Sequence, residues 1–533
     1  MSSTGRAIAR AGLIVSGAFL VSRVLGWVRL VVIGNVFGAS AELDALFAAF
    51  RLPDLIFQLV AAGALSSALI PVVSGVLVTD GEARAWRVIS TVTTLMLIAL
   101  LAMAAVVFIF ADTLVPLITP GFDAETTATT IELTRIMVLG PIFLAMGAVA
   151  TSVLNARDQF AAAAIAPIVY NLAIIGATLL LAPTMGVVGV AIGVVGGSLG
   201  HLLVQIPPLR ALGARFRFAI DLADDAARRA FALMVPRAIG LGASQITFFV
   251  VTALASDLGV GALAAFTIAF TLLQIPIGVI GVPLGVVLFP SLSREAALGG
   301  EIEFRRLLGR AVRLLLVAML PVAVLGTILR TETVALLFGS FSADAIALTA
   351  ATFAAFLPGL PAHALIAVLA RAFYARQDTL TPVLAAIGAV IINTTLAILL
   401  VEPLGLPGVA LAIAIAAWLE AGTLAILLRR RLGPLDLAGV GGVALRTALA
   451  SAAAGLAGIG VRALLEDVLV VPSASGGFAT AVAAALTMLA VGAAFAATFA
   501  LAALVLRIDD LRSIVGLMVD AIRRPREPRA DAS

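Results

Sequence analysis

Apolar stretches long enough to cross a lipid bilayer recur along almost the whole chain. A membrane-spanning helix needs about 20 mainly apolar residues. Such runs lie near 11–37, 45–74, 88–111, 132–154, 161–182, 187–209, 231–256, 262–290, 311–329, 346–373, 381–401, 407–428, 442–462 and 477–506. Only 12% of the residues are charged, about half the share in soluble proteins. We therefore predict an all-α polytopic membrane protein with about fourteen transmembrane helices.

The positions of the basic residues predict how the chain is oriented in the membrane. Every basic residue outside the two histidines is an arginine. If the N-terminus is cytoplasmic, the inner loops and both termini carry most of these arginines, whereas the outer side has only Arg330 and Arg462. Cytoplasmic loops of membrane proteins are enriched in basic residues. The sequence therefore predicts a multi-pass protein with both termini in the cytoplasm.

The sequence also contains an internal repeat. Four pairs of stretches share one offset of 219 residues: 69–74 with 288–293, 115–125 with 334–344, 155–158 with 374–377, and 186–193 with 405–412. We predict an N-lobe over 1–219 and a C-lobe over 220–438, each with six helices. Two added helices follow over 439–508, and a cytoplasmic tail over 509–533. An even number of spans gives both lobes the same orientation, and parallel repeats are typical of transporters.

Two arginines stand deep inside the first predicted span. Arg23 lies about 18 Å into a helix that starts near residue 11, and Arg29 is about 120° further around it. A charge at the bilayer centre costs at least about 2.5–3.5 kcal/mol. We expect both side chains to face a wet cavity and to bind an anion, because guanidinium grips phosphate oxygens bidentately. The alternative is a buried ion pair with an acidic neighbour.

Prolines interrupt two spans at corresponding places in the repeat. Pro53 follows Arg51 in "FRLPDLIFQL", and Pro276 and Pro283 lie in "QIPIGVIGVPLG". Proline removes a backbone donor and disfavours helical geometry at the preceding residue. Broken helices at membrane depth are tolerated where they line a cavity. The two breaks therefore indicate a shared binding site.

The sequence gives no support for an enzyme. Cysteine is absent, which excludes thiolate metal sites and disulfides. No His/Asp/Glu cluster has metal-ligand spacing, no nucleophile is paired with a base, and no phosphate-binding loop for ATP is present. We predict no cofactor, no metal and no nucleic-acid partner.

Several motifs together resemble a known family. They are "SRVLGWVR", "DALFAAFRLPDL", "AAGALSSALIPV", "LNARDQFAAAAIAPIVYN", "GHLLVQIPPLR", "QIPIGVIGV" and "RAFYARQDTLTPV" followed by "IIN". In this order and spacing, from about residue 6 to 430, they resemble the MurJ (MviN) lipid II flippases. These belong to the multidrug/oligosaccharidyl-lipid/polysaccharide exporter superfamily. The resemblance implies fourteen helices in two lobes and alternating access around a cationic cavity in the bacterial plasma membrane. The substrate would be undecaprenyl-diphosphate-linked peptidoglycan precursor, moved from the inner to the outer leaflet.

The resemblance also implies site residues. Arg23 and Arg29 fall on the functional arginines of the first helix, and Asp44 falls on an acidic residue at the start of the second. The chain departs from the family pattern elsewhere: Thr271 and Gln274 stand where the family has Arg and Glu. Further departures are Phe57, Gln58 and Ala62. The diphosphate grip would then depend on Arg23, Arg29 and Arg51.

Two equivalent turns after the fourth and tenth spans predict a cytoplasmic rim. Arg157 lies in "NARDQF", and Arg376 and Asp378 lie in "YARQDTLTP". We expect these arginines to attract anionic headgroups or to brace a gate. Ordinary loop charge is the alternative.

Two other functions compete with lipid II transport. One is an exporter of another lipid-linked oligosaccharide, or a drug or ion antiporter of the same superfamily, although a drug exporter would favour carboxylates over arginines. The other is a non-transporting scaffold of the cell-wall machinery. The expected partners are the lipid-linked precursor, membrane lipids and cell-wall synthases.

Overall fold

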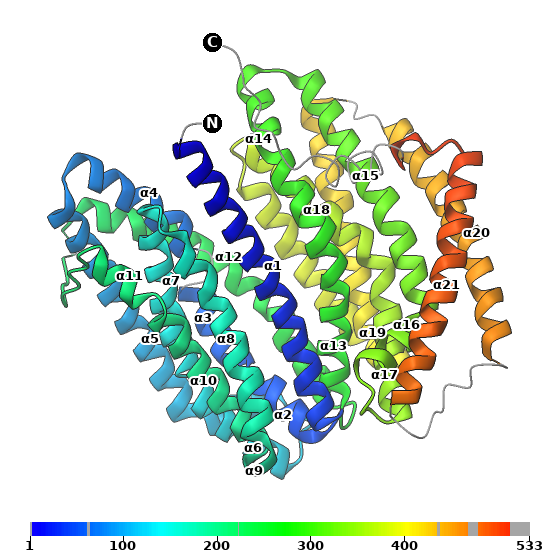
Figure 1. The fold of residues 1–533 in the computed structure, drawn as a ribbon, viewed down its shortest axis with the longest axis horizontal. Coiled ribbons are helices and arrows are strands. Elements are labelled where there is room, and N and C mark those ends of the chain that lie inside the picture. The colour runs from blue at the N-terminus through cyan, green and yellow to red at the C-terminus, as the bar shows by residue number, and fades with distance from the viewer. Residues whose placement is uncertain (1–2, 61–63, 222, 434–436, 467–477, 512–533) are drawn as a thin grey trace. The chain divides into compact units, whose positions relative to one another are not determined.

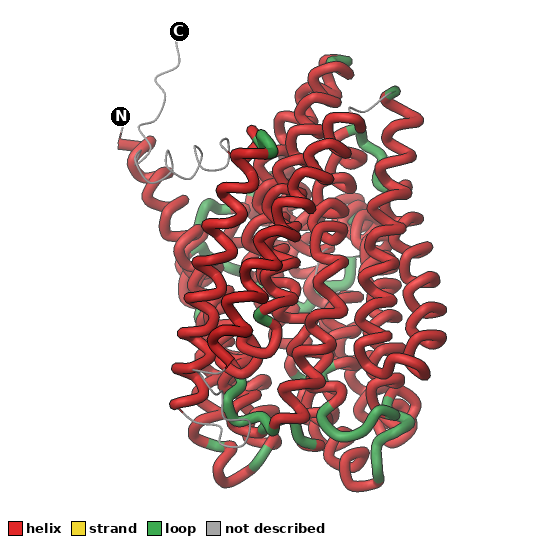
Figure 2. Tube along the Cα trace, turned by 90° about the vertical axis from the view of Figure 1, so that its right-hand side faces the viewer, coloured by secondary structure: helices red, strands yellow, loops and turns green. Residues whose placement is uncertain are grey.

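The computed structural model describes residues 3–60, 64–221, 223–433, 437–466 and 478–511. Within these residues the ordered structure is helical and contains no strand (Figure 2). The chain divides into two compact units, Met1–Ala264 and Ala265–Ser533. The predicted all-α class is therefore confirmed.

The first unit is built from twelve helices and the start of a thirteenth. They are α1 (Ser3–Phe37), α2 (Ala41–Ala49), α3 (Arg51–Val60), α4 (Ala64–Thr79), α5 (Glu82–Ile118), α6 (Ala124–Met137), α7 (Gly140–Ala156), α8 (Phe160–Leu180), α9 (Ala182–Met185), α10 (Val187–Leu203), α11 (Ile206–Ala211) and α12 (Asp225–Ser256). One set of apolar side chains of α5, including Met96 and Leu100, is buried in a core shared with α3, α4 and α7. α12 packs against α3, α4 and α5.

The second unit holds the remaining helices. They are α13 (Ala262–Pro276), which begins in the last residues of the first unit, the π-helix η1 (Ile277–Gly281), α14 (Val282–Leu298), α15 (Glu301–Ile328), α16 (Arg330–Leu337), α17 (Ala343–Phe356), the 3₁₀ turn η2 (Leu357–Gly359), α18 (Leu360–Ala375), α19 (Leu380–Leu432), α20 (Leu437–Glu466) and α21 (Phe478–Val505). Phe266, Phe270 and Phe356 form an aromatic cluster between α13 and α17. The C-terminal helices α20 and α21 pack against each other (Figure 1).

Among the described residues, eleven helices are long and apolar enough to cross a membrane. One of them, α19, is 53 residues long and turns at Gly405, so it contains the two predicted spans 381–401 and 407–428. The predicted span 45–74 is divided among α2, α3 and α4, and its residues 61–63 lie outside the described part. The count of fourteen stays a prediction. So does the tail, because residues 512–533 also lie outside the described part.

The repeat offset seen in the sequence reappears in helix boundaries. α6 starts at Ala124 and ends at Met137, and α17 starts at Ala343 and ends at Phe356. Both boundaries differ by the offset that aligns the sequence repeats. α5 and α15 likewise begin at corresponding residues, Glu82 and Glu301.

Backbone geometry follows the same offset. Gly186 has φ 57° and ψ −143°, and its counterpart Gly405 has φ 61° and ψ −145°. Asp158 and Gln377 also correspond, and they adopt φ of 58° and 61°. Non-glycine residues rarely take positive φ, so the agreement at this turn is specific to the repeat.

The limit between the two compact units differs from the predicted lobe limit by one helix, α12. The repeat places the boundary at 219/220, whereas the first compact unit continues to Ala264 and includes α12. The sequence repeat and the packing of this structure therefore divide the chain at different points, because α12 buries its side against α3, α4 and α5.

Candidate functional site

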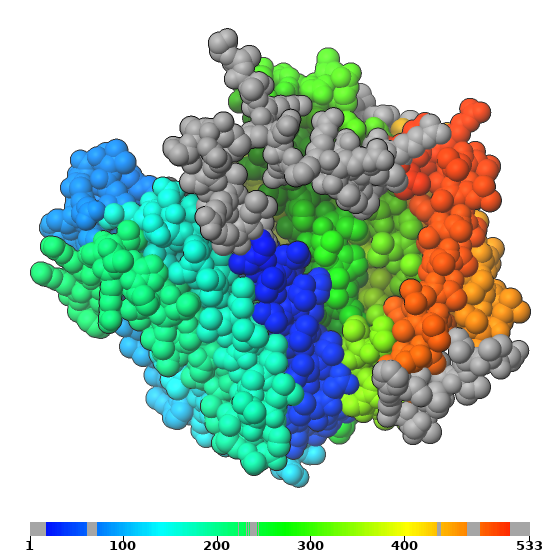
Figure 3. All heavy atoms as spheres, in the orientation of Figure 1, coloured from blue at the N-terminus to red at the C-terminus, as the bar shows by residue number. Residues whose placement is uncertain are grey.

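The two arginines of the first helix lie beside α8 in the first unit. Arg23 and Arg29 are both partly buried on α1. α1 packs along α8 (Figure 3), and Asn171 of α8 donates a hydrogen bond of 3.4 Å to the carbonyl of Ser22. The guanidinium of Arg29 lies over the ring of Tyr170, 5.5 Å from its centroid. A cation over an aromatic face is attracted to the ring without being neutralised.

Arg51 begins α3 and reaches α12. Its Nε donates to the Thr252 hydroxyl at 2.9 Å, and its guanidinium lies 5.3 Å from the centroid of the Phe248 ring. Thr252 is fully buried, and its own hydroxyl donates to the carbonyl of Phe248. The Nε–H of Arg51 is thus held by a neutral partner, and its two terminal nitrogens make no hydrogen bond within the described residues.

Asp54 brings the two arginines into one electrostatic cluster. It lies one turn after Arg51 on α3, and its carboxylate interacts electrostatically with both Arg51 and Arg29. Asp54 also acts on Tyr170, which carries Arg29 above its ring. Its side chain is exposed in the first unit. Arg29 and Arg51 therefore belong to the same local site, which we call the arginine cluster: Arg29, Arg51, Asp54, Tyr170 and Thr252.

The arginines of this region differ from Arg135 in the last turn of α6. Arg135 forms a 2.6 Å ion pair with Asp112. Within the described residues, Arg23, Arg29 and Arg51 form no ion pair at salt-bridge distance with any carboxylate. The alternative of a buried ion pair with an acidic neighbour therefore does not describe these three side chains within the described residues.

Asp44 is used differently from what the family resemblance implies. It is 1% exposed, and its two carboxylate oxygens accept hydrogen bonds from the backbone N–H groups of Gly261 and Ala264 at 2.6 and 2.7 Å. The carboxylate thus caps the N-terminus of α13, where free N–H groups and the helix dipole favour an anion. In this conformation neither oxygen is available to a substrate.

The remaining predicted residues of the site lie on α3 and α13 to α14. Thr271 donates its hydroxyl to the carbonyl of Thr267 on its own helix, and Gln274 is exposed one turn later. Pro53 occupies the first turn of α3, directly after α2 and α3 separate at Phe50. Proline is tolerated in a first turn, where its missing N–H has no helical partner.

A π-helix occupies the break predicted from the paired prolines. Pro276 ends α13, Pro283 lies in the first turn of α14, and η1 fills five of the six residues between them. A Cβ on Gly281 would meet Ala364 of α18 at 3.2 Å. The absence of a side chain at Gly281 therefore permits close packing at this irregular turn.

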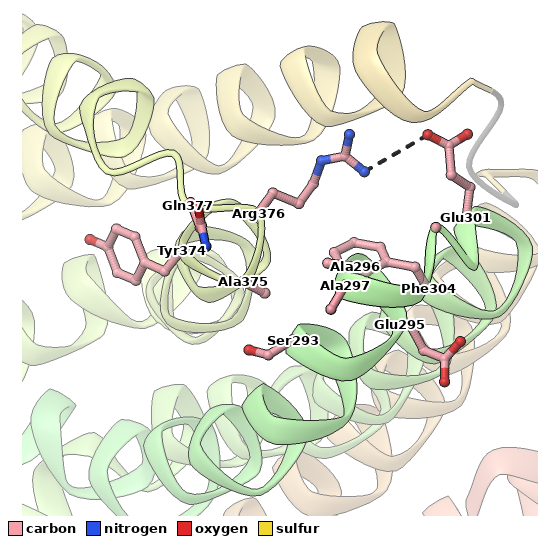
Figure 4. Close-up of a pocket in the computed structure, with 11 residues that line it drawn as sticks. Ser293, Glu295, Ala296, Ala297, Glu301, Phe304, Tyr374, Ala375, Arg376 and Gln377 are labelled. Carbon is pink, nitrogen blue, oxygen red and sulfur yellow. Dashed lines mark ion pairs between the residues drawn. The ribbon is translucent and has the colours of Figure 1, made fainter.

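The two rim arginines form ion pairs at equivalent places in their own units. Arg157 bonds Glu82 at 3.0 Å, and Arg376 lies 3.9 Å from Glu301. Arg376 reaches from the end of α18 toward Glu301 across a cavity of about 580 Å³ (Figure 4). These contacts fit a bracing role at each turn.

Asp378 contacts both the start and the end of α19. It accepts hydrogen bonds from the backbone and hydroxyl of Thr381 at 3.0 and 2.6 Å, and it pairs with Arg431. Burial raises the pKa of Asp378, but the bonds from Thr381 and the Arg431 charge outweigh it and hold the pKa at about 2. The carboxylate is therefore ionised at neutral pH.

Sequence reasoning missed the neutral partners of the arginine cluster. Tyr170, Phe248 and Thr252 carry no charge and stand far from the arginines in the sequence. Asp54 offered a signal, because it follows Arg51 by three residues and so shares its helix face.

Comparisons with known proteins assign the family. The family model described as lipid II flippase MurJ matches residues 33–476. The lipid II flippase MurJ of Burkholderia cenocepacia is 32% identical over 433 residues, which cover 79% of this chain and 84% of that protein. The probable lipid II flippase MurJ of Rhizobium tropici is 34% identical over 433 residues, covering 78% of this chain and 80% of the relative.

Solved structures agree at the level of the fold. A lipid II flippase MurJ in an inward closed conformation matches with a TM-score of 0.74 and 23% identity, covering 91% of this chain and 98% of that one. An inward-facing multidrug resistance transporter of the MATE family matches with a TM-score of 0.63 and 18% identity, covering 78% of this chain and 96% of that one. The match over most of the chain shows that this protein is a member of the lipid II flippase MurJ family.

Proposed function

We propose that this protein is a flippase that moves lipid II, the undecaprenyl-diphosphate-linked peptidoglycan precursor, from the inner to the outer leaflet by alternating access. Membership of a family of transporters rather than enzymes supports the proposal. Within this role, the polar headgroup crosses the membrane while the undecaprenyl tail stays in lipid.

The observation that carries the substrate assignment is the state of the in-span arginines. Arg23, Arg29 and Arg51 form no carboxylate ion pair among the described residues, and Arg29 and Arg51 are positioned by neutral side chains. A diphosphate offers several anionic oxygens at the spacing of a guanidinium fork. With Nε of Arg51 on Thr252, its two terminal nitrogens would grip one phosphate end-on.

Asp54 gives the cluster a way to release its ligand. Its carboxylate interacts with Arg29 and Arg51 when no ligand is bound. An arriving diphosphate carries more negative charge and would replace Asp54 as the counter-ion of both arginines. When the headgroup leaves, Asp54 is available again, so the arginines are never without a nearby anion.

The arginine bias of the sequence supports the orientation in the membrane. We place the protein in the bacterial plasma membrane with both termini in the cytoplasm, because this orientation puts most arginines on the inner side. Cell-wall synthases are the class of protein partner that the function implies, since they consume the precursor on the outer leaflet.

Reconstitution tests the proposal directly. Purified protein in liposomes that contain labelled lipid II should move the label between leaflets faster than protein-free liposomes, and a labelled phosphatidylglycerol should not be moved. Depletion of the protein in its host should leave lipid II in the inner leaflet. Equal movement of lipid II with and without the protein would contradict the assignment.

A further inference from the structure

An apolar groove in the second unit contains a single acidic side chain. The groove has a volume of about 390 Å³ and lies between the two halves of α19, on either side of the turn at Gly405. Its wall includes Leu384, Gly388, Ile392, Leu419 and Leu427. Glu420 lies among these apolar groups and is partly buried.

Glu420 lies at membrane depth. It is nine residues before Arg429, the first of three consecutive arginines at the end of α19, which corresponds to about 14 Å along the helix. It is also about 21 Å from the start of the second half of α19 near Leu406. Ionisable residues at such depth are costly and mark ion or proton pathways by default.

The carboxyl group has no partner within the described residues. It forms no hydrogen bond and no ion pair there, and the polar groups that share the groove are Thr381, Thr423 and Arg431. Arg431 is about 16 Å further along the helix, and it is already paired with Asp378.

Charged and titratable groups on the neighbouring helices do not face the groove. α17 and α18 pack against α19. Their titratable or charged side chains are Asp344, His363, Arg371 and Tyr374, and none of these lines the groove. A carboxylate at Glu420 would therefore be an unpaired charge in an apolar wall, which is far more costly than the neutral acid.

We propose that Glu420 is a proton-binding site of the transporter. The neutral acid is the form that fits the conformation described here. When the groove opens to water, the carboxyl releases its proton to solution and becomes a carboxylate, and on closing it takes a proton back. The ligand is a proton rather than a metal ion, because the described groove supplies no second carboxylate to hold a cation.

The corresponding position of the first unit supports a dedicated role. His201 on α10 precedes Glu420 by the repeat offset, and it is likewise partly buried, with a ring Nδ1 that has no hydrogen-bond partner in the described part of the chain. Both units thus place a titratable side chain at the same position of the helix that follows the turn at Gly186 or Gly405. Apolar residues fill most other positions of these two helices.

Infrared spectroscopy of the purified full-length protein tests proton binding without requiring transport. The wild-type protein should show the C=O stretching band of a protonated carboxyl at neutral pH, and the band should fall as the pH is raised. Glu420→Gln should lack this band. Glu402→Gln is the matched control, because it removes an exposed carboxyl from the same helix and should keep the band.

Two outcomes of this experiment would overturn the proposal. One is an equally strong band in Glu420→Gln. The other is a wild-type band that does not respond to pH, since a carboxyl that never releases its proton cannot exchange it.

A second experiment tests coupling and rests on the proposed function. In liposomes with labelled lipid II, a pH gradient should change the wild-type rate several-fold and should leave the Glu420→Gln rate unchanged. A gradient response in Glu420→Gln equal to that of the wild type would overturn coupling at this site. Failure of the wild type to move lipid II at all would count against the proposed function, while the infrared result would still decide proton binding.

Discussion

The two repeats of this chain agree at the turns that carry Arg157 and Arg376 and differ at the position of Arg51. Glu82 and Arg157 pair in the first unit, and their counterparts Glu301 and Arg376 pair in the second. At the position of Arg51, however, the second repeat has Phe270, which packs with Phe266 and Phe356. The turns that shape the fold are duplicated, whereas the cationic group is found in one copy.

This difference shows that two copies of one fold can differ in the charge that they place at the same position. An arginine at depth is costly unless a polar partner or ligand solvates it. The first compact unit surrounds Arg51 with Thr252 and Phe248 of α12, which belongs to the second sequence repeat, and with Asp54 of α3. The second repeat replaces the cation by an aromatic ring whose burial stabilises the unit. We infer that the first unit binds the charged part of the substrate and that the second unit holds the proposed proton site.

The largest expected effect is the loss of diphosphate binding when Arg51, the position at which the repeats differ, is replaced. Arg51→Ala removes the end-on grip, and a hydrogen bond to a charged group is worth about 1.5–3 kcal/mol. Diphosphate binding should weaken about 10- to 100-fold, while membrane abundance stays near normal because the lost charge was itself costly at depth. Binding of a soluble diphosphate analogue and immunoblots of membranes measure both quantities.

The counterpart variant Phe270→Ala is the control for this experiment. It should lower the free energy of unfolding by about 1–3 kcal/mol, because an aromatic contact is lost. It should leave diphosphate binding intact. If Arg51→Ala unfolds the protein and Phe270→Ala abolishes binding, the division of tasks between the repeats is wrong.

A smaller effect is expected when the arginines keep their charge. Arg23→Lys and Arg29→Lys preserve the cation but lose the planar fork, so they should bind the diphosphate several-fold more weakly. Arg135→Lys is the matched control, since Arg135 is paired with Asp112 away from the cluster. Unchanged flipping in Arg23→Ala and Arg29→Ala at normal abundance would show that these side chains are not the substrate site.

The fold was largely accessible from the sequence. Hydropathy located the apolar helices, and four short matches at one offset predicted a repeat whose helix boundaries and positive-φ turns recur in both units. These features can be predicted because a run of apolar residues or a turn glycine determines the structure of its own segment. The assignment of α12 to the first unit was not accessible, since it depends on which helices bury its surface.

The site was accessible only in part. A charged residue in an apolar run is visible in any sequence, so Arg23, Arg29 and Arg51 could be singled out. The partner of Arg51 is 201 residues away in sequence, and nothing in a threonine marks it as such a partner. Asp44 shows the opposite case: its carboxylate was expected at the substrate, but tertiary packing brings it to the N-terminus of α13.

The rim pairs should show a modest and unequal effect. Arg157 approaches Glu82 at 3.0 Å, whereas Arg376 approaches Glu301 at 3.9 Å. Partly exposed ion pairs contribute about 0–1 kcal/mol. Arg157→Ala should therefore slow lipid II flipping by a few-fold and Arg376→Ala by less, at equal abundance. Full growth and transport in both variants would show that these arginines are ordinary loop charges.

The smallest effect concerns a carboxylate at a turn position where the first repeat has an uncharged residue. Asp378 binds Thr381 and Arg431, and the corresponding residue of the first repeat is the uncharged Gln159. Because the pKa of Asp378 is lowered to about 2, the carboxylate stabilises the folded state above its unfolded pKa of about 3.9. That stabilisation is lost as the pH falls toward 2.

Asp378→Asn should therefore lower the melting temperature of the detergent-solubilised protein at neutral pH, with a loss of at most about 1 kcal/mol because the pair is partly exposed. The difference from wild type should shrink as the pH is lowered below about 4. Gln159→Ala, at the equivalent turn of the first unit, should show no such pH dependence. A difference in melting temperature between Asp378→Asn and wild type that stays constant or grows on acidification would mean that the carboxylate charge does not stabilise this turn. The turns of the two repeats would then not differ in this respect.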